Sequence, residues 1–290
     1  MAGLLNTAAG TIPADPSASV AGRTLRVQVV SDLHVDIVDT RQLRLAPGAD
    51  LVAVVGDTRA GAASAFAYLR RHIPAPIPIV AVLGNHEFYG SAIESGLGRA
   101  REAAGCLGIT LLEDEAAVIA GVRFLGATLW TDYALFGPAH RAVAMAAARR
   151  GMNDHRLISV GRGPERRPFL PGDAAILHAA SVRFLDATLA VPFDGPSVVV
   201  THHAPHPVCI APRFGRDPLG AAFASDLSAL IDTRRPDVWI SGHTHHPVDT
   251  CLGPTRLVSN PHGYRDECRG TFDPAFVVEI PVTPRMEDLT

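Results

Sequence analysis

Polar side chains follow five apolar runs of this chain, at the point where each run ends. Carboxylate, imidazole and amide groups recur at these positions. The blocks read Asp32-Leu33-His34, Gly56-Asp57, Gly84-Asn85-His86-Glu87, Thr201-His202-His203 and Gly242-His243-Thr244-His245. In open α/β sheets, ligands bind in the crevice beyond the carboxyl ends of the strands. If the apolar runs are strands of such a sheet, these side chains meet in one shared site.

The residue types in these blocks are those of a metal site. Carboxylate oxygen, imidazole nitrogen and amide oxygen together suit Mn, Fe, Zn, Co or Ni rather than an ion that prefers thiolate. In the D-x-H and H-x-H pairs the side chains are two residues apart, which puts both on one face of an extended segment. The blocks supply seven candidate ligands: Asp32, His34, Asp57, Asn85, His202, His243 and His245.

Seven ligands are too many for one tetrahedral ion, and they suit two ions that share a bridging carboxylate. Two such ions can clamp a phosphoryl group and generate a hydroxide nucleophile near neutral pH. The glycines before Asp57, Asn85 and His243 fit tight turns that bring the backbone close to the ions. The pattern therefore favours metal-assisted hydrolysis of a phosphoester.

Strand-like runs alternate with Ala-rich helical stretches along most of the chain, which predicts an α/β sheet protein. Several runs are nearly continuous in Val, Ile and Leu, as is typical of strands covered on both faces. The expected strands are 25–31, 50–56, 77–84, 122–129, 197–201, 237–241, 256–259 and 276–280. The expected helices are 60–72, 92–105, 139–150, 174–190 and 222–232.

The composition excludes several classes of protein. Hydrophobic residues make up 47% of the 290 residues, which is enough for a core and too much for a disordered chain. The net charge of −3 argues against general nucleic-acid binding, and no apolar run is long enough to span a membrane. All 26 basic residues are arginine, which removes lysine chemistry. Four dispersed cysteines and the lack of a targeting segment favour a cytoplasmic setting.

We expect a single domain over residues 23–283. Residues 1–22 are rich in Ala, Gly, Pro, Ser and Thr and are expected to form a flexible tail, and residues 284–290 a second tail. Within the domain, the stretch near 131–172 is expected to form an irregular loop insertion, because its second half is rich in Arg, Pro and Gly. Loops of this kind often carry specificity.

The ordered set of blocks resembles the calcineurin-like metallophosphoesterase superfamily. D-x-H, GD, GNH[DE], H and GHxH all occur between residues 32 and 245, with no ligand substituted. The resemblance implies two packed mixed β-sheets flanked by helices, with a dinuclear site at the sheet ends. It also implies a division of the ligands: Asp32, His34 and His245 on one ion, Asn85, His202 and His243 on the other, and Asp57 bridging both.

Other residues are candidates for substrate contact. In the family, the histidine at the position of His86 contacts the phosphate and is a candidate to protonate the leaving oxygen, with an aspartate or a metal-held water as the alternative. His202 is expected on the metal. Its neighbour His203 is expected to support the site or contact the substrate, because adjacent strand residues point to opposite faces. Arg156 and Tyr264 are the remaining candidates.

The resemblance implies a phosphoester hydrolase that uses a metal-activated hydroxide on a small phosphorylated substrate, with Mn, Fe or Zn as the expected ions. After Gly56-Asp57 this chain lacks the acidic residue of the GDxVDRG block that protein phosphatases of the superfamily carry. This argues against protein-phosphatase activity, and the GNHE form of the third block with the histidine pair at 202–203 resembles the phosphodiesterase-type branch. Two alternatives stay open: a phosphomonoesterase or nucleotidase, and a metal-binding scaffold without catalysis.

Overall fold

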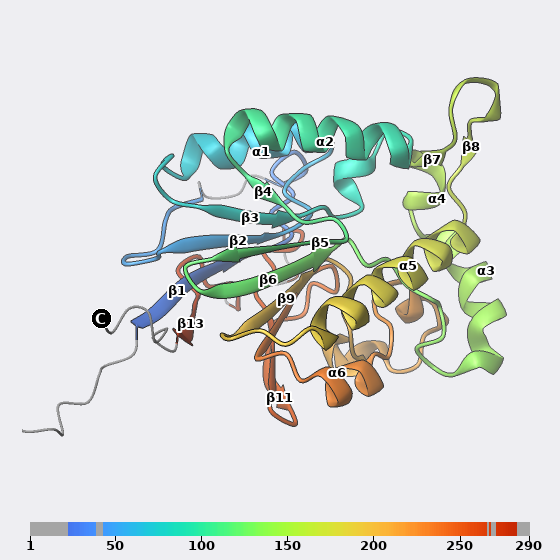
Figure 1. Ribbon diagram of the computed structural model, residues 1–290. Coiled ribbons are helices and arrows are strands. Elements are labelled where there is room, and N and C mark those ends of the chain that lie inside the picture. The colour runs from blue at the N-terminus through green and yellow to red at the C-terminus, as the bar shows by residue number, and fades with distance from the viewer. Residues whose placement is uncertain (1–22, 39–42, 266, 268–270, 283–290) are drawn as a thin grey trace, which may run out of the picture.

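Two large β-sheets packed face to face form the centre of the molecule, and helices flank them (Figure 1). This computed structural model describes residues 23–38, 43–265, 267 and 271–282. The architecture is the one predicted from the sequence. The tails expected at residues 1–22 and 284–290 lie outside the described residues.

The first sheet is mixed and has five strands in the order β13-β1-β2-β3-β4. Strands β1 to β4 run parallel to their neighbours, whereas β13 pairs antiparallel with β1. The strands are β1 Arg23–Val30, β2 Leu51–Val55, β3 Ile79–Val82, β4 Thr110–Leu111 and β13 Val277–Val282.

The second sheet has six strands in the order β11-β12-β10-β9-β6-β5. Its four inner strands are parallel, and its two edge strands, β11 and β5, are antiparallel to their neighbours. The strands are β5 Glu115–Ile119, β6 Val122–Ala127, β9 Ser197–Thr201, β10 Val238–Ser241, β11 Val248–Leu252 and β12 Thr255–Ser259.

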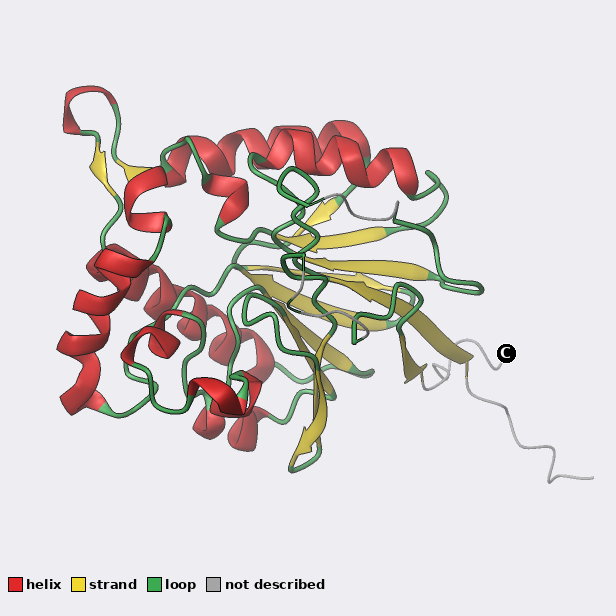
Figure 2. Ribbon diagram, turned by 180° about the vertical axis from the view of Figure 1, so that it is seen from behind, coloured by secondary structure: helices red, strands yellow, loops and turns green. Residues whose placement is uncertain are grey.

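Helices cover the outer faces of the sheets (Figures 1 and 2). Helices α1 and α2 pack together over the first sheet, and α5 lies along the second, with α6 beside it. The helices are α1 Ala62–His72, α2 Ile93–Leu107, α3 Arg141–Gly151, α4 Asp154–Leu157, α5 Pro171–Ala190 and α6 Ser228–Arg234. Among the described residues, no helix is both long and apolar enough to cross a membrane.

Alternate residues of each central strand belong to different cores. In β2, Val52 and Val54 pack in the core that includes Phe66 of α1. Leu51 and Ala53 of the same strand pack in a second core, together with residues of the other sheet. Both faces of the strand are therefore buried, which explains why it reads as a continuous apolar run.

The structure differs from the predicted elements at the two edge strands, at the start of α6 and in the stretch between α3 and α5. The edge strands β5 and β11 were not predicted; three of the five side chains of each are exposed, so neither strand is buried on both faces. The helix predicted over 222–232 was wrong at its start: α6 begins at Ser228, whose N–H donates to Asp226 Oδ1 at 3.1 Å. The stretch expected to be irregular contains α4 and a short hairpin, β7 Ser159–Val160 with β8 Arg167–Pro168.

Gly126 of β6 lies where the two sheets touch. A Cβ at this position would lie 2.6 Å from Leu112 Cβ and 2.7 Å from Val82 Cγ1. We expect Gly126→Ala to overpack the core between the sheets and to lower the free energy of unfolding by about 1–3 kcal/mol, measured by urea denaturation. Gly105→Ala in α2, where a new methyl group meets open space, is the matched control and should not destabilise. An unchanged midpoint for Gly126→Ala would contradict this packing.

Candidate metal centre

The carboxyl ends of five strands from both sheets bring the predicted ligands to one place. Asp32 follows β1, Asp57 follows β2 and Asn85 follows β3, all in the first sheet. His202 follows β9 and His243 follows β10 in the second sheet. Backbone groups tie the strand ends together: Gly242 N donates to His202 O at 2.9 Å, and His243 N donates to Asp32 Oδ1 at 3.0 Å.

Five of the seven predicted ligands have a left-handed backbone. Asp32, His34, Asp57, His243 and His245 have φ between 45° and 65°. The spacing predicted that the two members of each D-x-H and H-x-H pair lie on one face of an extended segment. This prediction is wrong, because these segments are not extended. They converge because the chain turns sharply at each of them. Such conformations are unfavourable for residues with a Cβ and are concentrated at functional sites.

Two glycines allow these turns to approach each other closely. A Cβ at Gly84 would lie 2.6 Å from Asp57 N, and one at Gly242 would lie 2.7 Å from Asp32 Oδ2. Neither contact is possible for a real side chain. The glycines were predicted to bring the backbone close to the ions. In the structure these glycines let neighbouring turns and ligand carboxylates pack against each other.

The first group of ligands consists of Asp32, His34 and His245. His34 Nε2 lies 3.0 Å from His245 Nε2, and His245 Nε2 lies 3.4 Å from Asp32 Oδ1. His245 Nδ1 donates to Glu267, which fixes Nε2 as the ring nitrogen that faces the group. His34 is fully buried, and burial lowers its pKa to about 4, so its ring is neutral, as a ligand must be.

The second group consists of Asp57, His202 and His243, with Asn85 beside them. His202 Nε2 lies 3.0 Å from Asn85 Oδ1 and 3.1 Å from His243 Nδ1. Asp57 Oδ2 lies 3.5 Å from His202 Nε2 in this group and 3.9 Å from His34 Nε2 in the other. The Asp57 carboxylate therefore lies between the two groups.

The charges in this cluster fit a cation. Among the described residues no arginine forms an ion pair with Asp32 or Asp57, although both are buried. Burial opposes protonation of His202, yet Asp57 raises its pKa to about 9. Burial likewise opposes protonation of His245, yet Asp32 and Glu267 raise its pKa to about 10. The carboxylates thus attract positive charge into a buried site that holds no arginine, which a metal ion can supply.

Glu87 holds the turns that carry the ligands. Its carboxylate accepts hydrogen bonds from the backbone N–H groups of Asp57 at 2.9 Å, Thr58 at 2.8 Å and Gly84 at 2.8 Å. Burial raises the pKa of Glu87 to about 7. The residue belongs to one of the five sequence blocks, but no role was predicted for it. Glu87 lies three residues after Gly84, whose N–H it accepts from, and this short spacing is the signal that could have indicated its role.

Asp154 of α4 orients the amide of Asn85. Asp154 Oδ1 accepts hydrogen bonds from Asn85 Nδ2 at 2.8 Å and from Tyr89 OH at 2.9 Å. Because Asn85 Nδ2 is held there, its Oδ1 faces His202. No spacing in the sequence indicates this contact, since Asp154 and Asn85 are 69 residues apart.

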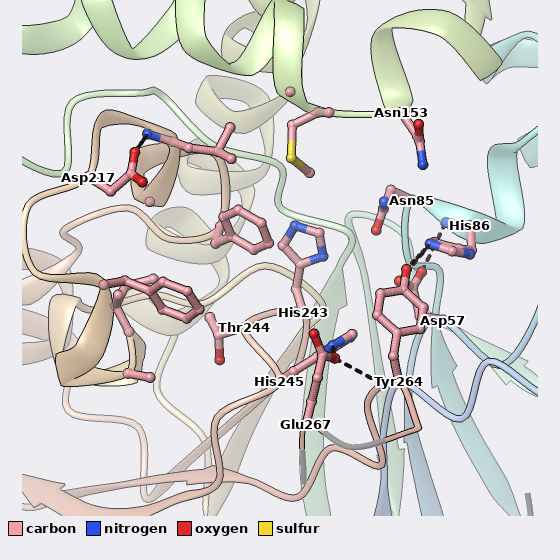
Figure 3. A pocket seen from close by; sticks show the side chains of 18 of the residues that line it. Asp57, Asn85, His86, Asn153, Asp217, His243, Thr244, His245, Tyr264 and Glu267 are labelled. Atoms are coloured by element: carbon pink, nitrogen blue, oxygen red, sulfur yellow. Dashed lines mark hydrogen bonds and ion pairs between the residues drawn. The ribbon is translucent and has the colours of Figure 1, made fainter. Parts of the chain in front are cut away.

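His86 and Tyr264 lie at the open side of the cluster (Figure 3). His86 Nε2 lies 3.8 Å from Asp57 Oδ2 and 3.3 Å from Tyr264 OH. The Tyr264 ring stacks on that of His34, with centroids 4.5 Å apart. Tyr264 N also donates to Glu267 at 2.9 Å, so one segment carries both the phenol and the carboxylate that contacts His245.

His203 and Arg156, the other predicted contact residues, do not line the cavity. His203 is buried behind His243, with ring centroids 4.2 Å apart, and its Nδ1 bonds to Thr128 O at 3.1 Å. It is therefore placed to support His243 rather than to touch a substrate. Arg156 is exposed and its guanidinium bonds to Asn153, which does line the cavity.

A cavity of about 300 Å³ opens directly onto the cluster (Figure 3). Asp57, Asn85, His86, His243 and His245 form its polar side. Its opposite side comes from the segment 210–223 and from the end of α3, which belongs to the stretch near 131–172 that was expected to carry specificity. The residues of that side include Met152, Ile210, Arg213, Phe214, Leu219 and Phe223.

A family model for calcineurin-like phosphoesterases matches residues 25–247, a range that holds all seven ligands. The chain belongs to this family. Membership assigns it to the phosphoester hydrolases, as the resemblance of the motifs implied, and it agrees with the cluster of metal-binding residues. No curated protein sequence matches the chain.

Solved structures of similar fold include the phosphopantetheinyl hydrolase of Mycobacterium tuberculosis. It is 19% identical, with a TM-score of 0.68 over 90% of this chain and 96% of that one. The purple acid phosphatase of yellow lupin (Lupinus luteus) seeds is 15% identical, with a TM-score of 0.41 over 82% of this chain and 44% of that one. The first similarity extends over nearly the whole of both chains, in agreement with the two-sheet architecture.

Asp154 offers a test of how Asn85 is positioned. We expect Asp154→Ala to weaken metal binding by about 10–100-fold, because the Asn85 amide loses the acceptor that fixes its orientation. The measurement is competition with a chelator of known affinity on the purified protein. Tyr89→Phe removes the longer hydrogen bond of Asn85 Nδ2, the one to Tyr89 OH at 3.1 Å, but keeps the bond to Asp154 at 2.8 Å, so it should have a smaller effect. Equal effects of the two variants would contradict this role.

Proposed function

We propose that this chain is a two-metal phosphodiesterase that hydrolyses a small phosphorylated substrate. The observation that supports it best is the position of Asp57. Its Oδ2 faces His34 on one side and His202 on the other, which is what a carboxylate that bridges two ions requires. Family membership supplies the reaction class, the hydrolysis of a phosphoester.

The ligand groups indicate which residues would hold each ion. Their mixture of carboxylate, imidazole and amide ligands suits Mn, Fe or Zn. Bound ions of this kind supply positive charge to the phosphoryl oxygens and lower the pKa of the attacking water. One ion would be held by Asp32, His34 and His245, the other by Asn85, His202 and His243, with Asp57 shared.

His86 is the residue best placed to serve the leaving group. It lines the cavity beside the ligands, and its imidazole can donate a proton to the departing oxygen. Tyr264 OH lies within reach of His86 Nε2. Burial raises the pKa of the Tyr264 phenol, so it stays protonated: its oxygen can accept a hydrogen bond from His86 Nε2 while its O–H donates to a phosphoryl oxygen.

The charge of the cavity wall favours a diester over a monoester. Among the described residues that line the cavity, Arg213 is the one arginine. A monoester carries a dianionic phosphate, which proteins commonly bind through several arginine contacts. A diester carries a single negative charge and needs less support. A phosphomonoesterase or nucleotidase is the alternative, and the complete ligand set with His86 argues against a scaffold without catalysis.

The test compares two substrates on one Mn-reconstituted sample. We expect bis-p-nitrophenyl phosphate to be hydrolysed faster than p-nitrophenyl phosphate, and removal of the metal by a chelator to abolish both reactions. A faster monoester would favour the alternative enzyme, and no hydrolysis of either by a metal-loaded sample would favour the scaffold.

His86→Gln tests the assigned proton donor. We expect kcat to fall by about 10²–10⁴-fold while the metal content stays that of the wild type. His140→Gln, an exposed histidine outside the site, is the matched control and should behave as the wild type. His34, Asp57 and His86 offer ligand atoms close enough to share one ion. Loss of metal in His86→Gln would therefore show that His86 is a ligand and would contradict its role as the proton donor.

A further inference from the structure

The cavity at the metal centre has two chemically different ends. Figure 3 shows His243 between them: Asp57 and His86 lie on one side of it, and Thr244 and Asp217 lie toward the other. The first end is made of the ligand side chains. The second end is made largely of the segment 210–223, which the ligand chemistry does not use.

The second end is largely apolar. Ile210, Phe214, Leu219 and Phe223 all line it. The Phe223 ring stacks on that of His243, with centroids 4.8 Å apart, so the apolar wall begins directly at a ligand. Phe214 lies at the opening and is 48% exposed, which leaves apolar surface for a bound group to cover.

The polar side chains at this end are few and partly engaged. Asp217 Oδ1 accepts a hydrogen bond from Leu219 N at 2.9 Å and caps the short 3-10 helix Pro218–Ala222. The Arg213 guanidinium lies over the Phe214 ring, 4.8 Å from its centroid. One arginine beside one aspartate gives the wall little net charge. A chain of further phosphates would find a single cation there.

The conformation of the wall is also restricted before any ligand binds. Two 3-10 helices in this segment begin at prolines, Pro212–Phe214 and Pro218–Ala222. Proline fixes φ and restricts the residue before it, which limits the conformations that the wall can adopt. A pre-formed apolar wall of this kind favours one class of ligand without a large cost of ordering.

We propose that the substrate of this enzyme carries an uncharged, largely apolar organic arm next to its phosphoester, and that the arm lies along Ile210, Phe214 and Leu219. The inference rests on the proposed function, because that function places the phosphoryl group at the ligand end. The cavity volume, about 300 Å³, is sufficient for a small organic group. A nucleoside polyphosphate does not match this wall.

The test uses ethyl, butyl and hexyl phosphate as product-like inhibitors of bis-p-nitrophenyl phosphate hydrolysis, with calorimetric binding of the same ligands as a second readout. Each methylene group that is fully buried should tighten binding by about four-fold. 2-Phosphoglycolate, a short arm that ends in a carboxylate, should bind no more tightly than ethyl phosphate. Equal inhibition along the series, or tighter binding of 2-phosphoglycolate, would overturn the proposal.

Variants of the wall locate the arm. Phe214→Ser and Ile210→Thr should reduce the gain in affinity per methylene, and because Phe214 is half-exposed its substitution should not prevent folding. Val208→Ala, an exposed apolar residue of the neighbouring turn that does not line the cavity, is the matched control and should leave the series unchanged. An unchanged series in both wall variants would place the arm elsewhere and refute the assignment.

The two proposals fail in different ways. If metal-loaded protein hydrolyses diesters but shows no dependence on arm length, the inference about the arm is wrong and the proposed function stands. If no ester is hydrolysed, the proposed function is wrong, and calorimetry still decides whether the wall binds an apolar arm.

Discussion

The position of Asp57 between two groups of histidines is the constraint on which the rest of this structure depends. The carboxylates of Asp57 and Asp32 are both buried, and neither has an arginine partner among the described residues. Buried carboxylates are costly unless positive charge accompanies them, so this cluster favours a metal ion or protonated histidines beside Asp32 and Asp57. The nearby carboxylates also raise the pKa values of His202 and His245, which shows that they favour positive charge in the site. The cluster is therefore built for cations.

The fold meets this demand by placing ligands on turns rather than on regular strands. Left-handed backbone at a residue with a Cβ costs about 1–2 kcal/mol, and five ligands adopt it. These conformations persist because backbone hydrogen bonds hold them, such as His34 N to Asp57 O at 3.0 Å. Glu87 adds three more hydrogen bonds to the same turns. The buried parallel strands beneath provide the rigid base.

Much of this could be predicted from the sequence, and the reason is local. Each ligand follows directly after a buried strand, so its block is readable within a few residues, as for Asp57 after β2 or His243 after β10. The continuous apolar runs likewise reveal strands buried on both faces. Exposed edge strands such as β11 leave no such pattern, and they were not predicted.

The parts that were not predicted depend on contacts between distant segments. Asp154 orients Asn85 from α4, and nothing in its own neighbourhood indicates that partner. The apolar wall around Phe214 and Leu219 becomes a wall only when the chain folds back over the strand ends. Conversely, Arg156 has the chemistry of a phosphate contact, yet it does not line the cavity, and its guanidinium bonds to Asn153. The type of a residue alone does not show whether its side chain points into the cavity.

The most direct test of the central claim is the number of metal ions per chain in the wild type and in Asp57→Asn, measured by elemental mass spectrometry after identical reconstitution and removal of free metal. We predict about two ions per chain in the wild type and the loss of both together in the variant, because the shared carboxylate belongs to both ligand groups. Two ions retained in Asp57→Asn, or a single ion in the wild type, would contradict the bridging role of Asp57.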